Sequence, residues 1–340
     1  MEMIKNLPDP SGLSKKEIMD ILLTEEYGNI PARPYSVSAQ LIGDQGSFAA
    51  GKADLIKYSL ECKAEWGECS FPFYYSAPKG KQNLPCFIHL NFRDLVPDKY
   101  QPTEEIIDAG YAIFTIYYKD VTSDNGDFTN GIAGAVFPNG ERKDDDCGKI
   151  GLWAWAAMAV MDYAQTLPEL DHSKISVIGH SRLGKTALLA GALDECFYCA
   201  FSNDSGCSGA SIARETKGER IKDIVRAFPY WFCKNYYKYA DNVESLPFDQ
   251  HWLICANLPH KVYVASAVED LWACPRNEYL ACVAADKYYR DHGMKGFIHP
   301  DRLPEIGELL HEGDIGYHMR KGIHFLGRED WLNYIKFLGF

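Results

Sequence analysis

Residues 174–194 read Lys-Ile-Ser-Val-Ile-Gly-His-Ser-Arg-Leu-Gly-Lys-Thr-Ala-Leu-Leu-Ala-Gly-Ala-Leu-Asp. The β-branched run at 175–178 predicts a buried strand. Gly179 ends this run, and from Arg182 onward apolar residues recur at helical spacing. The stretch therefore predicts a strand, a sharp turn and a helix, with Ser181 at the turn. Such a turn exposes a serine hydroxyl and places the backbone N–H groups of the helix start beside it.

The same residues also match a phosphate-binding motif. Gly179 and the run 184–186 satisfy G-x-x-x-x-G-K-[ST], so the turn fits either a serine hydrolase or a nucleotide-binding protein. A phosphate loop wraps its backbone around an anion and favours small residues, whereas positions 180–183 are His, Ser, Arg and Leu. The segment 262–270 is only a loose candidate for the strand that would end in a magnesium-binding aspartate. These features favour the hydrolase over nucleotide binding.

A serine hydrolase of this kind needs an acid and then a histidine downstream of the serine. The predicted strand 261–267 is followed by Glu269 and Asp270, which places two carboxylates at the carboxyl end of a strand. His324 lies in a glycine-marked loop before the last predicted helix. The order of the residues fits, although Leu183 stands where the pattern G-x-S-x-G requires its second glycine.

Composition excludes several classes of partner. The 340 residues are 46% apolar and 24% charged, with a net charge of −12. Nucleic acids and anionic membrane surfaces require a basic footprint, so neither is an expected partner. No apolar run is long enough to cross a bilayer.

The cysteines and the first residues of the sequence indicate the cellular compartment of the protein. Eleven cysteines, mostly in apolar surroundings, predict free thiols in a reducing environment. The pair Cys196 and Cys199 is expected to be structural and not a metal site. The start lacks the layout of a signal peptide, which favours a cytoplasmic location, although a secreted chain whose signal had been removed would look the same.

Strands alternate with helices along the chain, which predicts one α/β domain with a mostly parallel sheet covered on both faces. Residues 1–50 are expected to form an N-terminal extension packed on a single catalytic domain at 51–340, and 120–148 a long polar surface loop. The predicted strands are 53–77, 84–92, 111–118, 175–178, 199–203 and 261–267, and the predicted helices are 15–23, 104–109, 153–163, 219–227, 249–258, 278–289 and 331–338.

The run Gly179–Lys185 resembles the G-x-S-R-x-G-K signature of the glucuronoyl esterases, carbohydrate esterase family 15. Similar blocks follow in order through residues 85–335, and the resemblance is strongest to bacterial members. It implies an α/β-hydrolase fold, a three-layer αβα sandwich, and a serine esterase without metal or organic cofactor. The implied substrates are esters of glucuronic or 4-O-methylglucuronic acid, such as those that join xylan to lignin. The blocks are 202–209, 228–232, 246–251, 265–272 and 316–324.

We expect Ser181 to be the nucleophile of an acyl-enzyme mechanism and His324 its general base. The resemblance allows the triad acid to be Asp204 or Asp270. Asp270 is preferred, because aspartate at position 204 is one methylene shorter than the glutamate usual there. Glu269 is a third candidate.

Further roles are implied by the resemblance. Arg182 is expected to stabilise the oxyanion, which would explain a cation at the unfavourable positive end of a helix. Lys185, Trp272 and Glu219 are expected to contact the sugar. The alternatives are a solvated lysine for Lys185 and core packing for Trp272.

The sequence predicts a glucuronate ester hydrolase that takes a glucuronate ester or a glucuronoxylan-derived substrate and acts as a monomer. An esterase for acetylated xylan, a P-loop nucleotide-binding protein and a binding module without catalysis are the alternatives.

Overall fold

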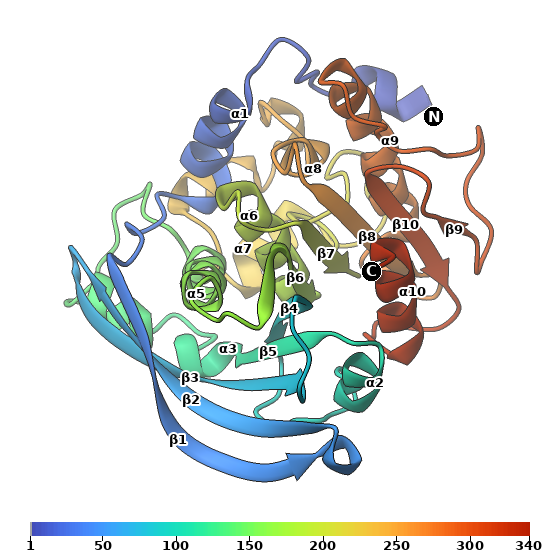
Figure 1. Cartoon of the computed structure of the whole chain (residues 1–340). Coiled ribbons are helices and arrows are strands. Elements are labelled where there is room, and N and C mark those ends of the chain that lie inside the picture. Colours follow the sequence, from blue (N-terminus) through green and yellow to red (C-terminus); the bar gives the residue numbers. More distant parts are fainter. Residues whose placement is uncertain (1) are drawn as a thin grey trace.

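The computed structural model describes residues 2–340, which surround one sheet of ten strands (Figure 1). The strand order is β1-β2-β3-β5-β4-β6-β7-β8-β10-β9. The six neighbours from β5 to β10 run parallel, whereas β1, β2, β3 and β9 pair antiparallel at the two sides. The strands are β1 (Ser36–Phe48), β2 (Ala53–Ala64), β3 (Gly67–Pro78), β4 (Leu84–Asn91), β5 (Ala112–Tyr117), β6 (Leu170–His180), β7 (Cys199–Asn203), β8 (Lys261–Ala267), β9 (Leu309–Leu310) and β10 (Ile315–Arg320).

Helices cover both faces of the sheet, with α5 and α6 on one face and α2 and α10 on the other (Figure 1). Short helical turns join several of them. The helices are α1 (Lys15–Leu22), α2 (Thr103–Asp108), α3 (Tyr118–Val121), α4 (Gly131–Val136), α5 (Lys149–Ala164), α6 (Arg182–Leu193), α7 (Ile221–Ala227), α8 (His251–Cys255), α9 (Pro275–Asp291) and α10 (Arg328–Leu338), and the turns are η1 (Glu2–Asn6), η2 (Leu23–Tyr27), η3 (Ala49–Gly51), η4 (Lys234–Tyr239) and η5 (Val243–Ser245).

The central strands are buried on both sides, as parallel strands between two helical layers must be. In β4, Cys86 and Ile88 pack into the larger core under α5 and α6, while Phe87 packs into the smaller core under α10. The predicted α/β-hydrolase class, a three-layer sandwich with a mostly parallel sheet, is confirmed. The predicted strands 199–203 and 261–267 coincide with β7 and β8.

No strand was predicted in residues 1–50, and that prediction is wrong. Ser36–Phe48 form β1, which pairs with β2 along its length at the edge of the sheet. Residues before β1 do pack on the body, since the carbonyl of Pro8 accepts hydrogen bonds from His251 and Trp252. The division of the chain at residue 50 stays a prediction.

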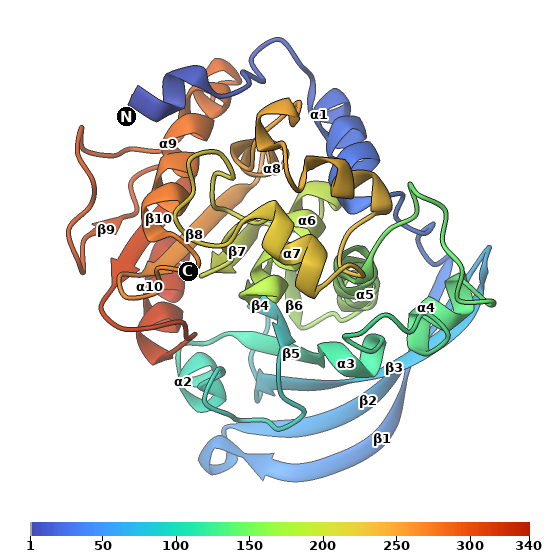
Figure 2. The ribbon, with the colours of Figure 1, turned by 180° about the vertical axis from the view of Figure 1, so that it is seen from behind.

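The prediction of a long loop at 120–148 is also wrong in part, because α3 ends in this segment and α4 lies within it. In Figure 2, α7 lies in front of the central strands, and α3 and α4 lie next to β3. Within residues 2–340, no helix combines the length and apolarity needed to cross a membrane. The cysteines are free thiols and nine are buried, but Cys196 is exposed, so only Cys199 of that pair is a core residue.

Candidate active site

Ser181 occupies the turn between β6 and α6 with φ 57° and ψ −129°. A serine in this left-handed region is strained by about 1–3 kcal/mol, and such strain persists only where the surroundings hold it. Its N–H donates to the carbonyl of Asn203 in β7 at 2.8 Å, and its own carbonyl accepts from the N–H of Gly184 at 2.8 Å. These bonds fix the serine at the carboxyl end of the sheet and at the start of a helix.

Close packing requires glycine at position 179 and leaves little room beside Gly184. A Cβ at Gly179 would lie 2.0 Å from the carbonyl oxygen of Leu183, and one at Gly184 would lie 3.1 Å from the Cβ of Ser205. Leu183 itself is fully buried. The departure from G-x-S-x-G therefore has a structural reason, because the tight contact falls at position 184 and position 183 supplies a core side chain.

His324 lies in the loop between β10 and α10, next to Asp270, which follows β8. The imidazole Nδ1 is 2.5 Å from Oδ2 of Asp270, while Oδ1 of the same carboxylate accepts from the N–H of Ala273 at 3.2 Å. The side chain of Asp270 is 4% exposed and that of His324 is 43% exposed. A hydrogen bond from Nδ1–H to a carboxylate leaves Nε2 as the basic nitrogen of an accessible histidine.

Asp204, the other expected acid, follows β7 and is buried. Its carboxylate accepts hydrogen bonds from the N–H of Ala267 at 2.7 Å, the guanidinium of Arg320 at 3.3 Å and the N–H of Phe325 at 3.4 Å. One of its oxygens and one oxygen of Asp270 lie within 4.8 Å of a ring nitrogen of His324. Asp204 thus fastens the loop of His324, and Asp270 makes the hydrogen bond to the ring.

The three close groups Asp204, Asp270 and His324 have the spacing of a metal-ligand set. The guanidinium of Arg320, however, is itself a cation against Asp204, and a second cation there would be repelled. Glu269, the third candidate acid, is exposed. The arrangement suits proton transfer between a histidine and a carboxylate better than metal binding.

Arg182, directly after Ser181, does not extend into solvent. Its side chain is 23% exposed and forms an ion pair with Asp124. The guanidinium lies over the ring of Trp231 at 4.5 Å and that of Phe228 at 5.2 Å. Within the described residues, its buried Nε atom has no hydrogen-bond partner. Sequence reasoning missed Asp124, which was assigned to a polar surface loop.

Lys185, Glu219 and Trp272 are brought together. The Lys185 ammonium donates to the carbonyls of Ser205, at 2.6 Å, and Cys207, and pairs with Glu219 at 3.0 Å. The N–H of Glu219 donates to the carbonyl of Trp272 at 2.8 Å. Trp272 is 57% exposed, so it does not pack in the core, and the side chain of Lys185 is only 3% exposed, so it is not solvated.

The same contacts weigh against the phosphate loop. The lysine of such a loop reaches the phosphates of a nucleotide. Here three protein acceptors already surround the ammonium of Lys185. Asp270, the loose candidate for a magnesium-binding aspartate, is hydrogen-bonded to His324.

Three other histidines, His180, His251 and His318, have structural partners. The ring of His180 bonds to Asn203 at 2.6 Å and lies 4.4 Å from the ring of His324, and burial holds the pKa of His180 well below its usual value. His251 bonds to the carbonyl of Pro8. His318 lies in β10, before the loop of His324, and bonds to Asp330 at 2.9 Å.

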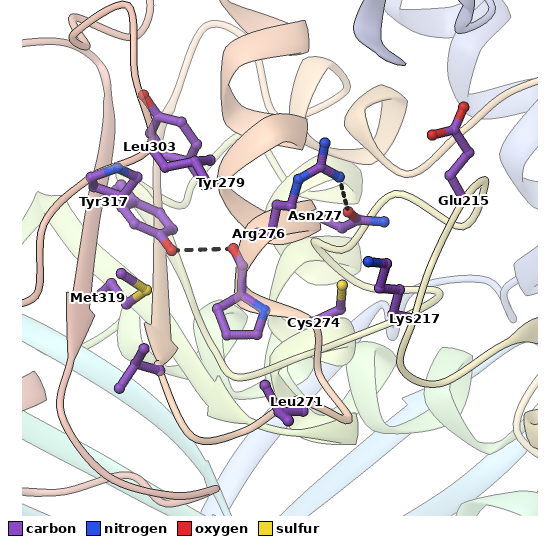
Figure 3. Close-up of a pocket in the computed structure, with 13 residues that line it drawn as sticks. Glu215, Lys217, Leu271, Cys274, Arg276, Asn277, Tyr279, Leu303, Tyr317 and Met319 are labelled. Carbon is purple, nitrogen blue, oxygen red and sulfur yellow. Dashed lines mark hydrogen bonds between the residues drawn. The ribbon is translucent and has the colours of Figure 1, made fainter. Parts of the chain in front are cut away.

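The segment that carries Asp270 also forms one wall of a cavity of about 700 Å³ (Figure 3). Leu271 and Cys274 from this segment face Tyr317 and Met319 of β10 across it. The hydroxyl of Tyr317 donates to the carbonyl of Pro275 at 3.3 Å. Lys217 and Arg276 add positive charge to a mostly apolar lining.

Comparison with known proteins gives consistent matches. Residues 61–293 match the family described as "Glucuronyl esterase, fungi". The chain is 41% identical over 236 residues to the carbohydrate esterase MZ0003 of an unknown prokaryotic organism, a match that covers 69% of this chain and 54% of that protein. It is 26% identical over 272 residues to a 4-O-methyl-glucuronoyl methylesterase of Podospora anserina, with 76% and 51% covered. The chain thus spans about half the length of the curated relatives it matches.

Solved structures match along nearly the whole chain. A glucuronoyl esterase from Solibacter usitatus superposes with a TM-score of 0.87 at 30% identity and covers 96% of this chain and 91% of its own. A promiscuous CE15 esterase from the marine bacterial metagenome superposes with a TM-score of 0.85 at 29% identity, with 98% and 96% covered.

Proposed function

The chain belongs to the glucuronyl esterase family, and on that basis we propose that it is a carboxylic ester hydrolase acting on esters of glucuronic acid. The observation that carries the proposal is the pair of His324 and Asp270, which follows Ser181 in the chain order of this fold. The name of the Podospora relative, a 4-O-methyl-glucuronoyl methylesterase, supports the sugar acid as the acyl group.

In the proposed mechanism, Nε2 of His324 takes the proton of the Ser181 hydroxyl as its oxygen attacks the ester carbonyl. Asp270 holds the ring in the required tautomer and stabilises the imidazolium that forms. The imidazolium then protonates the leaving alcohol, and a glucuronoyl ester of Ser181 remains. Water attacks this acyl-enzyme with His324 again as the base, which releases glucuronate and regenerates the serine.

Arg182 is proposed to stabilise the negative charge on the carbonyl oxygen during both attacks. Its backbone N–H lies at the start of α6, and its guanidinium is fixed over Trp231. Removal of a single donor to such an oxyanion costs about 3–4 kcal/mol in other enzymes. A fixed cation therefore accounts for a substantial part of the rate.

Lys185, Glu219 and Trp272 are proposed to form the sugar site. The three donors of the Lys185 ammonium are bound to protein acceptors, so Lys185 holds the Glu219 carboxylate in place. The carboxylate can accept hydrogen bonds from hydroxyl groups, and the exposed indole of Trp272 offers an apolar face. The proposed reaction uses protein groups alone, without metal or organic cofactor, and the protein is proposed to act as a monomer.

The test is hydrolysis of benzyl glucuronate beside para-nitrophenyl acetate, for the wild type and for Ser181→Ala. The expected result is turnover of the glucuronate ester that disappears in Ser181→Ala and persists in the control Ser173→Ala, which changes an exposed serine of β6. Turnover of the acetate alone would move the substrate to acetylated sugars such as acetylxylan. If the wild type hydrolyses neither ester, the proposal is overturned, and binding of magnesium–ATP is the next measurement.

A further inference from the structure

Asp124 and Arg182 are 58 residues apart in sequence and meet beside Ser181. The carboxylate of Asp124 is 7% exposed and accepts a hydrogen bond from Nη1 of Arg182. We propose that Asp124 is the positioning residue for Arg182, which it holds in the orientation that stabilises the oxyanion. This inference rests on the proposed ester hydrolysis at Ser181.

Asp124 is itself held in one orientation by two further donors. The hydroxyl of Tyr118 donates to Oδ2 at 3.0 Å, and Nε1 of Trp231 donates to Oδ1 at 2.9 Å. The backbone carbonyl of Asp124 also accepts from the hydroxyl of Tyr230 at 3.1 Å. The carboxylate thus has partners on both oxygens, so its position is determined independently of Arg182.

The loop around Asp124 is fastened to the core on both sides. The buried ammonium of Lys149 donates to the hydroxyl of Thr122 at 2.7 Å and to the carbonyl of Asp127 at 2.6 Å. The indole of Trp153 donates to the carbonyl of Thr122 at 3.4 Å. A lysine buried in α5 that binds both flanks of one short loop makes this loop part of the rigid body of the protein.

The guanidinium of Arg182 is held between the fixed carboxylate of Asp124 and two aromatic rings. The rings of Trp231 and Phe228 stack at 3.8 Å with an interplanar angle of 2°, and the guanidinium lies near both. Nη1 is bound to Asp124, while Nε is buried and has no partner in the described residues. Burial closes Nε to a substrate oxygen, whereas Nη2 is not buried and makes no hydrogen bond within the described residues. The donors left for the substrate oxygen are therefore on the exposed part of the guanidinium, whose side chain is 23% exposed.

An arginine side chain loses about 2 kcal/mol of rotamer entropy when it is fixed. If that ordering had to occur in each catalytic cycle, it would raise the barrier, because only donors fixed in advance stabilise the transition state fully. Asp124 and the stacked rings order the guanidinium before substrate binds. Trp231 takes part in both interactions that order Arg182, since its ring lies under the guanidinium and its indole N–H donates to Asp124.

The test is Asp124→Asn. The amide keeps the volume but has one acceptor oxygen, so it cannot serve Trp231 on one side and Tyr118 with Arg182 on the other. Loss of a residue that orients a metal ligand typically costs about 10- to 100-fold, and we take the same range for a residue that orients Arg182. We expect kcat for benzyl glucuronate to fall by about that factor, while KM changes less than about threefold. Asp127→Asn in the same loop is the matched control, because that exposed carboxylate bonds to Thr129 and not to the site.

A double-mutant cycle separates positioning from a general structural role. In the Arg182→Ala background, Asp124→Asn is expected to have almost no further effect on kcat. An equal loss of rate in both backgrounds would overturn the proposal, and so would an unchanged kcat in Asp124→Asn. If Asp124→Asn does not fold, Tyr118→Phe removes one orienting hydrogen bond, and a loss of kcat that depends on Arg182 is again expected.

The rate at which a fluorophosphonate labels Ser181 provides a second readout. It depends on the nucleophile and the oxyanion donors and not on the sugar. If the wild type labels rapidly but does not hydrolyse glucuronate esters, the proposed substrate is wrong, and the same cycle measured by labelling still tests Asp124.

Discussion

The choice between Asp270 and Asp204 as the acid partner of His324 can be decided by two matched substitutions. In Asp270→Asn, the charge-assisted bond of 2.5 Å to Nδ1 of His324 is replaced by a neutral one, and the amide can present its NH₂ group and select the wrong tautomer. Loss of the triad acid costs about 10⁴-fold in a well-studied protease. Because the His324 side chain is 43% exposed and water can help to orient it, we expect about 10³-fold, which is about 4 kcal/mol of transition-state stabilisation.

Asp204→Asn should have the opposite profile. It removes a carboxylate from the guanidinium of Arg320, which keeps its second partner Asp330, so we expect a cost below the 3–5 kcal/mol of a fully broken buried pair, or about 2 kcal/mol. At about 2.1 cal/mol/K per residue for 340 residues, this lowers Tm by about 3 °C. The rate should change by less than about tenfold, since Asp204 does not bond to His324.

The assay is kcat/KM for benzyl glucuronate beside thermal unfolding for both variants. A loss of about 10³-fold in Asp204→Asn with near-normal turnover in Asp270→Asn would refute the assignment. Comparable losses in both would show that the two carboxylates act on His324 together.

Two further substitutions test the buried charges. Lys185→Met should destabilise the protein by about 4 kcal/mol, or about 6 °C in Tm, because it leaves the Glu219 carboxylate buried without its cation. The double variant Lys185→Met/Glu219→Gln should recover part of this loss. Equal Tm values for wild type and Lys185→Met would contradict the pairing. Burial raises the pKa of Glu26 to about 7, so the folded protein keeps a proton that the unfolded chain loses above about 4.5. The free energy of unfolding should therefore fall by up to about 3 kcal/mol between pH 4.5 and 7, and Glu26→Gln should show a smaller fall in a pH series of Tm values, whereas an unchanged slope would refute the charge effect.

The strand, turn and helix around Ser181 could be predicted because they depend on residues close in sequence. The β-branched run, Gly179 and the amphipathic helix are all visible within residues 174–194. The order of Ser181, Asp270 and His324 was equally visible, since topology places the carboxyl ends of parallel strands at one edge. The structure then brings Asp270 and His324 together, while the choice of the catalytic acid stays a prediction.

Three strands, β1, β9 and β10, were missed, and two of them were missed for different physical reasons. β10 carries His318 and Arg320, which are buried polar residues that bond to Asp330 on α10, so the strand lacks an apolar run. β1 is an edge strand with most of its side chains partly or fully exposed, so no buried face marked its sequence. Hydrophobic periodicity detects strands by burial of apolar side chains and fails where polar groups are buried or the strand is exposed.

Asp124 could not be found from sequence for another reason. Its neighbours are polar and glycine-containing, as in any surface loop, and its partner Arg182 lies 58 residues away. The pairing depends on how the segment after α3 folds back over the start of α6. The sequence shows that an arginine at a helix start is electrostatically unfavourable. It does not show which acid compensates that charge.

The double match of the central motif has a structural explanation. Gly179 and Gly184 fit a phosphate loop by their spacing, but here the carbonyl of Leu183 requires glycine at position 179, and Ser205 packs tightly against Gly184. Lys185, the next residue, donates to the carbonyl of the same Ser205. The second glycine and the lysine therefore serve one purpose, the packing of α6 against the segment after β7. That segment begins with Asp204, which fastens the loop of His324. Glycine and lysine in this spacing thus connect the serine turn to the histidine loop, so substitutions at either should disturb the geometry between Ser181 and His324 and not the binding of a phosphate.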